Sequence, residues 1–321
     1  MVGMAEAIPR RKNPFLYSNS EIALISVPTA TMRAAATKEM SMQAGIGLPT
    51  TLPGADRNLI LDWAREADEG PFSTLGVFDR LVYDSYDPLI SLAAAAAVTR
   101  RVRLATTILT GPLYNTALLA KATASLDRLS GGRLVVGLAV GARESDYEAA
   151  AIEHRSRGRR LSEQMAALKS YWEEDAIGPA PMRQGGPELL TGGLSDQAFV
   201  RMARFANGYL HGGGPPRTFS NAAEKARAAW IDAGRPDKLL LWGMAYYALG
   251  DGAAEKGTQY LKHYYGFTGP FAEKIAGGLL ATPQAIAQLM RGYQEAGCDE
   301  LILFPTVTDI SQVHRLADVI G

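Results

Sequence analysis

The chain has 321 residues, and its 33 lysine and arginine residues are balanced by 33 aspartate and glutamate residues. A net charge of zero gives no long-range field toward nucleic acid or an anionic membrane, so we expect neither as a partner. A hydrophobic fraction of 47% is ordinary for a globular protein, and no apolar run approaches the roughly 20 residues of a membrane span. Cys298 is the only cysteine, which excludes an internal disulfide and favours a reducing cytoplasm.

Residues 1–41 are expected to form a flexible N-terminal extension, followed by a single domain over residues 42–321. The modest apolar run at residues 22–27 is bounded by Glu21 and Pro28, which argues against a secretory signal peptide.

From residue 43 onward, short apolar runs alternate with stretches of helical periodicity. Asp56 and Asp87 stand where N-caps of the first two helices are needed, and residues 161–172 carry an apolar stripe along one helical face. Eight strands alternating with helices predict an α/β fold, specifically a (β/α)8 TIM barrel rather than an open doubly wound sheet. The predicted strands are residues 43–48, 72–78, 102–109, 133–140, 188–191, 208–210, 239–249 and 301–305.

A family resemblance lies in the middle of the chain. Residues 118–141 read LLAKATASLDRLSGGRLVVGLAVG. This segment resembles the luciferase-like monooxygenase superfamily, the flavin-dependent or F420-dependent oxidoreductases related to bacterial luciferase. In that superfamily a long helix ending in Leu-Asp-x-Leu-Ser-Gly-Gly-Arg enters a strand that ends in Gly-x-x-x-Gly. The resemblance extends from about Gln43 to the C-terminus.

The resemblance implies a monooxygenase that uses reduced FMN and O₂ on a small organic substrate. A separate flavin reductase would then supply the reduced cofactor, and relatives often pair as homodimers. One alternative is a coenzyme F420-dependent hydride-transfer oxidoreductase on the same fold. A second alternative is a flavin-binding protein without catalytic activity.

The sequence Gly192-Gly193-Leu194-Ser195 is the best candidate for an anion site. Glycines let a bound group approach the backbone, and the N-terminus of the following helix offers free N–H groups with a partial positive charge. An ordinary N-cap role for Ser195 or Asp196 fits the local sequence equally well. The resemblance favours phosphate binding, because Gly192 and Gly193 match the Gly-Gly that holds the cofactor phosphate. Arg143 either adds positive charge or is an exposed surface residue.

Two further strand ends match positions of the family. Asp79 matches the acidic residue that closes the second strand, but Arg80 stands where many relatives have histidine. A histidine-based proton transfer at this position is therefore in doubt, and a cap or an ion pair with Arg80 is the alternative for Asp79. Thr107 and Ile108 lie where the family often has a non-prolyl cis peptide, so we expect one here. Such a bond costs about 3–4 kcal/mol.

His211 is the histidine among four that follows a predicted strand, and the resemblance places its surroundings beside the cofactor. We therefore predict His211 and Asp79 as catalytic residues. The aromatic tract over residues 260–267 is a candidate lid or substrate wall. No metal-binding motif, P-loop, dinucleotide fingerprint or nucleophile elbow is present. The predicted cofactor-binding residues are Asp79, Thr107, Ile108, Gly141, Arg143, Gly192, Gly193, Ser195, His211 and Gly212.

Overall fold

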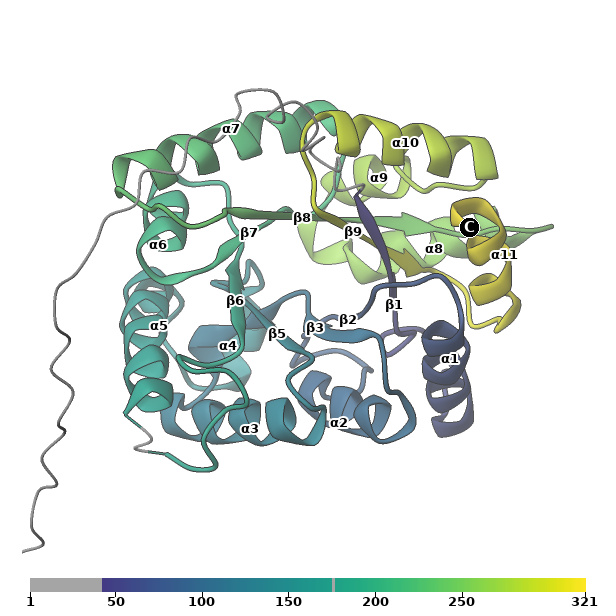
Figure 1. The fold of residues 1–321 in the computed structure, drawn as a ribbon. Coiled ribbons are helices and arrows are strands. Elements are labelled where there is room, and N and C mark those ends of the chain that lie inside the picture. Colours follow the sequence, from purple (N-terminus) through teal and green to yellow (C-terminus); the bar gives the residue numbers. More distant parts are fainter. Residues whose placement is uncertain (1–41, 175–176) are drawn as a thin grey trace, which may run out of the picture. The chain divides into compact units, whose positions relative to one another are not determined.

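The computed structural model describes residues 42–174 and 177–321, so the predicted extension over residues 1–41 lies outside the described residues. The strands of this part form one parallel sheet in the order β3-β2-β1-β9-β8-β7-β6-β5-β4, and an additional β3–β5 pairing closes it into a barrel (Figure 1). The strands are β1 (Gln43–Gly47), β2 (Thr74–Val77), β3 (Arg103–Thr106), β4 (Leu109–Thr110), β5 (Leu134–Ala139), β6 (Glu188–Thr191), β7 (Gly208–Leu210), β8 (Leu240–Tyr247) and β9 (Glu300–Pro305).

The predicted (β/α)8 barrel is confirmed, with one change in its third strand. We expected a single strand over residues 102–109, and the structure divides it into β3 and β4. Both parts pair with β5, through Leu104 opposite Leu134 and through Leu109 opposite Leu138. The two residues between them form a bulge, which is why nine strands occupy eight positions.

A ring of helices surrounds the strands, as Figure 1 shows. Asp56 and Asp87 cap the first two helices as predicted, because each carboxylate accepts a hydrogen bond from the backbone N–H three residues later, at 2.8 Å. The helices of this ring are α1 (Arg57–Glu69), α2 (Pro88–Val98), α3 (Thr116–Leu129), α5 (Arg157–Glu173), α6 (Asp196–Phe205), α7 (Pro216–Asp232), α10 (Pro283–Glu295) and α11 (Ser311–Ile320).

Shorter elements lie in the loops that leave the carboxyl ends of the strands. The loop after β8 is the longest helical insertion, because it holds two helices and a 3₁₀ turn before α10 begins. These added elements are η1 (Gly111–Leu113), α4 (Glu144–Ala149), η2 (His154–Ser156), α8 (Ala253–Tyr264), η3 (Gly266–Thr268) and α9 (Phe271–Ala276). Within the described ranges, none of the helices is both long and apolar enough to cross a membrane.

Two separate hydrophobic clusters follow from the alternation of side chains along each strand. On β8, Leu241, Ala245 and Tyr247 belong to the cluster between strands and helices. Trp242 and Met244, on the opposite face of the same strand, belong to the cluster inside the barrel. The barrel interior is therefore a packed core and not a pore.

An ionic network around one fully buried carboxylate fills the amino ends of the strands. Glu300 of β9 is fully buried, and its carboxylate accepts hydrogen bonds from Arg103 of β3 at 2.5 Å and from Ser73. Arg103 also pairs with Glu188 of β6 at 3.3 Å, and its guanidinium group stacks on Trp242 at 4.5 Å. Because this end is filled, a ligand of the barrel has to bind at the carboxyl ends of the strands.

Candidate active site

The loop between β6 and α6 has the form of an anion cradle. The backbone of Gly193 has φ +128°, and a Cβ added to Gly192 would lie 2.9 Å from the carbonyl oxygen of Leu210. Ser195 caps α6, because its hydroxyl accepts a hydrogen bond from Ala198 N–H at 3.3 Å. The first N–H groups of the helix have no intrahelical partner and carry its partial positive charge. The N-cap role of Ser195 and the glycine loop before it are therefore compatible with each other.

The peptide bond between Thr107 and Ile108 is trans, so the expected cis bond is wrong. The bulge is held without it. Thr107 donates two hydrogen bonds to the carbonyl oxygen of Val77, from its N–H at 2.8 Å and from its hydroxyl at 3.0 Å. The trans form avoids the roughly 3–4 kcal/mol that a non-prolyl cis bond costs. Ile108 nevertheless lies beside the cradle, 3.3 Å from where a Gly192 Cβ would be.

Asp79 ties the end of β2 to the segment after β4. Its carboxylate accepts a hydrogen bond from Thr110 N–H at 2.8 Å and interacts with the Tyr114 hydroxyl. Burial raises the pKa of Asp79 to about 6, while the bonds from Thr110 and Tyr114 oppose this rise. The alternative ion pair with Arg80 does not form within the described part of the chain.

His211 lies on the helix-facing side of the sheet. Its ring meets Phe219 of α7 edge-on, with centroids 5.8 Å apart, and only 3% of the residue is exposed. Burial lowers the pKa of His211 to about 4, so the ring is neutral at neutral pH. The Nδ1 atom of the ring is buried without a hydrogen-bond partner among the described residues. The next residue, Gly212, is exposed, and a Cβ there would meet no atom within 4 Å.

Gly141 and Arg143 begin the loop after β5. Gly141 has φ +66° and packs against Thr110, whose Cγ2 would be 2.6 Å from a Cβ at this position. Arg143 is half-buried, and its guanidinium group lies over the ring of Phe267 at 4.1 Å. Arg143 is therefore not an exposed surface residue, and it faces the insertion after β8 rather than the Gly192 loop.

Aromatic side chains of that insertion cover the carboxyl ends of the strands. Tyr260 and Tyr264 of α8 are both buried and belong to the same hydrophobic cluster as the barrel interior. The ring of Tyr264 lies 6.0 Å from Phe78, at the end of β2, and the hydroxyl of Tyr260 is hydrogen bonded to Thr51 at 2.7 Å. The tract that the sequence indicated as a lid or wall thus covers the mouth of the barrel.

Two arginines from different loops hold this cover in place. Arg80 donates to the carbonyl oxygen of Tyr264 at 3.3 Å, and Arg143 donates to the same oxygen at 3.1 Å. The guanidinium group of Arg80 also stacks on the Tyr264 ring at 4.2 Å. This contact of Arg80 could not be predicted from the sequence, since no local pattern shows which loops meet across a barrel.

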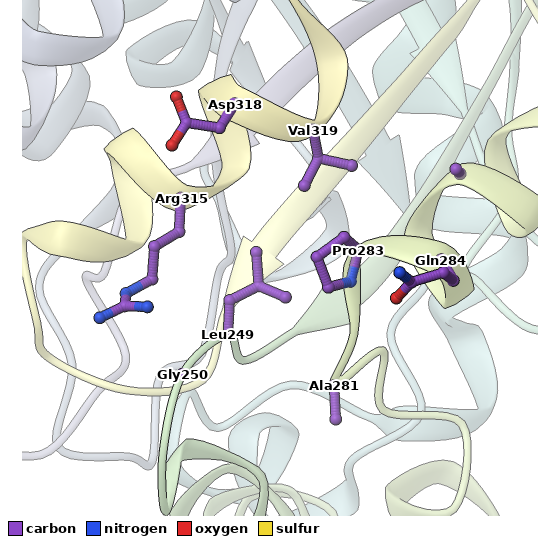
Figure 2. A pocket seen from close by; sticks show the side chains of 9 residues that line it. Leu249, Gly250, Ala281, Pro283, Gln284, Arg315, Asp318 and Val319 are labelled. Atoms are coloured by element: carbon purple, nitrogen blue, oxygen red, sulfur yellow. The ribbon is translucent and has the colours of Figure 1, made fainter.

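A cavity lies elsewhere, on the helical flank. It has a volume of about 570 Å³ and lies between the start of α10 and the C-terminal half of α11 (Figure 2). Pro283 and Gln284 line it from α10, and Arg315 and Asp318 line it from α11. None of the predicted site residues lines this cavity.

Comparison with known proteins assigns the chain to a protein family. The family model of the luciferase-like monooxygenases matches residues 40–297. The chain belongs to the luciferase-like monooxygenase family. An uncharacterized protein of Mycobacterium tuberculosis is 30% identical over 186 residues, a match that covers 49% of this chain and 65% of that protein. The match therefore spans just under two thirds of that relative's length.

Two further members of the comparison have assigned cofactors. The FMNH₂-dependent dimethylsulfone monooxygenase of Pseudomonas putida is 28% identical over 163 residues, covering 46% of this chain and 45% of that protein. A solved F420-dependent secondary alcohol dehydrogenase, in complex with an F420-acetone adduct, has a TM-score of 0.71 at 18% identity, covering 88% of this chain and 98% of that chain. The second likeness shows the shared barrel fold.

This luciferase-like monooxygenase family member folds as a (β/α)8 barrel. Its predicted site residues do not form one cluster in the structure. Ile108 lies beside the Gly192 loop, whereas Arg143 joins Arg80 under the α8 cover. Asp79 and His211 make structural contacts at the ends of β2 and β7.

Proposed function

We propose that this protein is a monooxygenase that uses reduced FMN and O₂ to oxygenate a small organic substrate. The observation that carries this proposal is the glycine cradle at Gly192 and Gly193, followed by the capped N-terminus of α6. The FMN-dependent dimethylsulfone monooxygenase among the relatives supports the choice of cofactor. A separate flavin reductase and a homodimer are parts of the same proposal.

The residues of the cradle fit a phosphate group. Gly192 is buried without a side chain, and Gly193 adopts a backbone conformation that favours glycine. Bare backbone and helical N–H groups bind a phosphate dianion by hydrogen bonds and by the helix dipole. In the proposed complex, Gly193, Leu194 and Ser195 hold the phosphate and Ile108 contacts the cofactor on its barrel side.

The chain's own contribution is binding, orientation and exclusion of water. When bound, the reduced flavin supplies the redox chemistry, with O₂ as the oxidant. Buried aromatic side chains, among them Phe78, Phe304 and Tyr264, form a dry apolar wall at the mouth. Because Tyr264 and its neighbours now fill the mouth, the α8 segment has to shift when a ring system binds there.

A coenzyme F420-dependent hydride-transfer enzyme is the second candidate. The F420-dependent secondary alcohol dehydrogenase shares the fold and supports this choice. The same cradle accommodates the phosphodiester of F420, so the Gly192 loop does not discriminate between the two cofactors.

The phosphate role is tested by comparing FMN with riboflavin, which lacks the phosphate. In Gly192→Ala the new methyl group meets the Leu210 carbonyl oxygen at 2.9 Å, so the loop must shift. We expect FMN affinity to fall at least about tenfold while riboflavin affinity stays unchanged. Gly158→Ala is the control, because a Cβ there makes only an ordinary contact of 3.6 Å with Arg201. Equal loss for both flavins, or no loss for FMN, would contradict the phosphate role.

Turnover separates the candidates. Oxygen uptake with NADH, FMN and a generic flavin reductase, dependent on an added sulfone, ketone or aldehyde, supports the monooxygenase. Consumption of reduced F420 without oxygen uptake supports the hydride-transfer enzyme. Micromolar flavin binding without turnover on the whole panel would instead indicate a flavin-binding protein without catalytic activity.

A further inference from the structure

Arg80 and Arg143 form an unusual pair under the α8 cover. They come from the loops after β2 and β5, and their guanidinium groups meet at one backbone oxygen, that of Tyr264. Both guanidinium groups lie over the ring of Phe267, 5.3 Å from its centroid for Arg80 and 4.1 Å for Arg143. Two positive charges thus converge on a neutral acceptor at the C-terminal end of α8.

Neither arginine has a carboxylate partner in residues 42–174 and 177–321. Asp146, the buried carboxylate of α4, accepts from Val82 N–H at 2.9 Å instead. Three guanidinium nitrogens are inaccessible to water and have no hydrogen-bond partner, namely Nε and Nη2 of Arg80 and Nε of Arg143. Desolvated N–H groups on a cation are costly unless an acceptor satisfies them.

Other arginines of the chain show how such groups are normally satisfied. Arg103 has carboxylate partners, and Arg133 donates five hydrogen bonds to acceptors on four residues, Ser130, Thr99, Val102 and Ala96. Arg80 donates one hydrogen bond to the carbonyl oxygen of Tyr264 and also interacts with the hydroxyl of that residue, and Arg143 makes two bonds to backbone carbonyls. The donors of this pair therefore exceed the acceptors around them.

We propose that Arg80 and Arg143 form an anion-binding subsite at the mouth of the barrel, which takes a carboxylate, sulfonate or phosphate group. The Tyr264 carbonyl oxygen stands where one anionic oxygen binds, and the bound anion displaces it. A planar guanidinium fork binds two oxygens of such a group, and two forks neutralise its charge. The anion comes either from an acidic substrate or from the cofactor.

This inference deepens the proposed function, on which its link to substrate or cofactor rests. The binding chemistry itself does not depend on turnover. Anion binding at this subsite also acts on the cover, because the same two donors hold the C-terminal end of α8. An acidic ligand is therefore expected to open the route to the Gly192 cradle as it binds.

The test is calorimetric titration of the full chain with benzoate and benzenesulfonate, against neutral benzamide of similar shape. We expect both anions to bind at least about tenfold more tightly than benzamide. Arg80→Gln and Arg143→Gln should each remove about tenfold of anion affinity and leave benzamide binding unchanged. Arg80→Lys should fall between Arg80→Gln and the parent, because it keeps the charge and loses the fork. Arg291→Gln, an exposed position on α10, is the control.

Equal binding of benzamide and benzoate to the unmodified chain would overturn the inference without any substitution. Unchanged anion affinity in both glutamine variants would do the same. The FMN-to-riboflavin affinity ratio, measured in the same variants, identifies the source of the anion. If the variants keep the preference for FMN over riboflavin, the subsite binds the substrate. If that preference disappears, the subsite binds the cofactor phosphate.

Failure of the proposed function looks different. If the unmodified chain binds benzoate selectively but neither FMN nor F420, the subsite stands and the flavin proposal falls. If flavins bind with the expected dependence on Gly192 but the anion selectivity is absent, only the subsite falls.

Discussion

Phe78 and Phe304 stack with their ring centroids 3.8 Å apart at the upper end of the barrel interior. This contact requires residues without side chains beside it. A Cβ on Gly47 would lie 2.1 Å from the Phe304 ring, and one on Gly76 would lie 2.9 Å from the same ring. The two glycines on β1 and β2 thus make room for an aromatic floor.

Gly47→Ala is expected to lower the free energy of unfolding by about 1–3 kcal/mol, because the new methyl group overlaps a buried ring. Urea denaturation followed by circular dichroism measures this loss. The double variant Gly47→Ala/Phe304→Leu should lose less free energy of unfolding than the sum of the losses in the two single variants, since leucine removes the overlap. Additive losses would show that the ring is not what restricts position 47.

Tyr260→Phe is expected to loosen the cover over the mouth. The variant removes the hydrogen bond to Thr51 and leaves a buried hydroxyl without a partner, a net loss of about 1 kcal/mol. Amide hydrogen exchange across α8 and α9 should therefore accelerate by roughly five- to tenfold, whereas exchange in α5 stays unchanged. Tyr171→Phe on α5 serves as the matched control. Uniform acceleration over the whole barrel would contradict a separately opening cover.

Features that depend on neighbouring residues could be predicted from the sequence, and contacts between residues far apart in the sequence could not. Apolar runs and caps are local signals, so the strands and the Asp56 and Asp87 caps could be predicted. The Gly192 loop was found for the same reason. The bond from Arg80 to Tyr264 joins residues 184 positions apart, and that from Arg143 spans 121 positions. Local patterns carry no information on such contacts.

The split of the third strand illustrates a different limit. Residues 102–109 have continuous β propensity, and nothing in their composition marks the bulge at Thr107 and Ile108. The bulge arises because Thr107 bonds twice to Val77 on the neighbouring strand. Only the register between strands reveals it.

Arg103→Met is expected to destabilise the protein by about 3–5 kcal/mol, because the fully buried carboxylate of Glu300 loses its cationic partner. Urea denaturation at pH 7 measures the effect. Arg103→Met/Glu300→Gln should recover more than half of the loss, since the buried charge is then removed as well. No recovery in the double variant would show that stacking of Arg103 on Trp242 is the larger contribution.

His211→Gln is expected to flatten the stability profile on the acid side. Burial lowers the folded-state pKa of His211 to about 4 from 6.5, so the unfolded chain binds a proton first as the pH falls. The parent therefore loses stability between about pH 6.5 and pH 4, by up to about 3 kcal/mol from this group. Urea midpoints of the parent and variant across this range should converge toward pH 4. Parallel curves would contradict a buried neutral imidazole.

Asp79→Asn tests the opposite dependence in an overlapping range. The folded-state pKa of Asp79 is raised to about 6 from 3.8, so the folded chain holds the proton more tightly than the unfolded chain does. Stability from this group is thus present below about pH 4 and is lost as the pH rises to 6, by up to about 3 kcal/mol. Asparagine still accepts the Thr110 N–H and carries no charge, so the variant should be the more stable protein above pH 6 and should match the parent near pH 4. Tyr114→Phe removes a bond that stabilises the ionised form and should shift the parent's loss of stability to higher pH. A variant that loses stability relative to the parent at pH 7 would show that the ionised carboxylate is needed to hold β2 to the segment after β4.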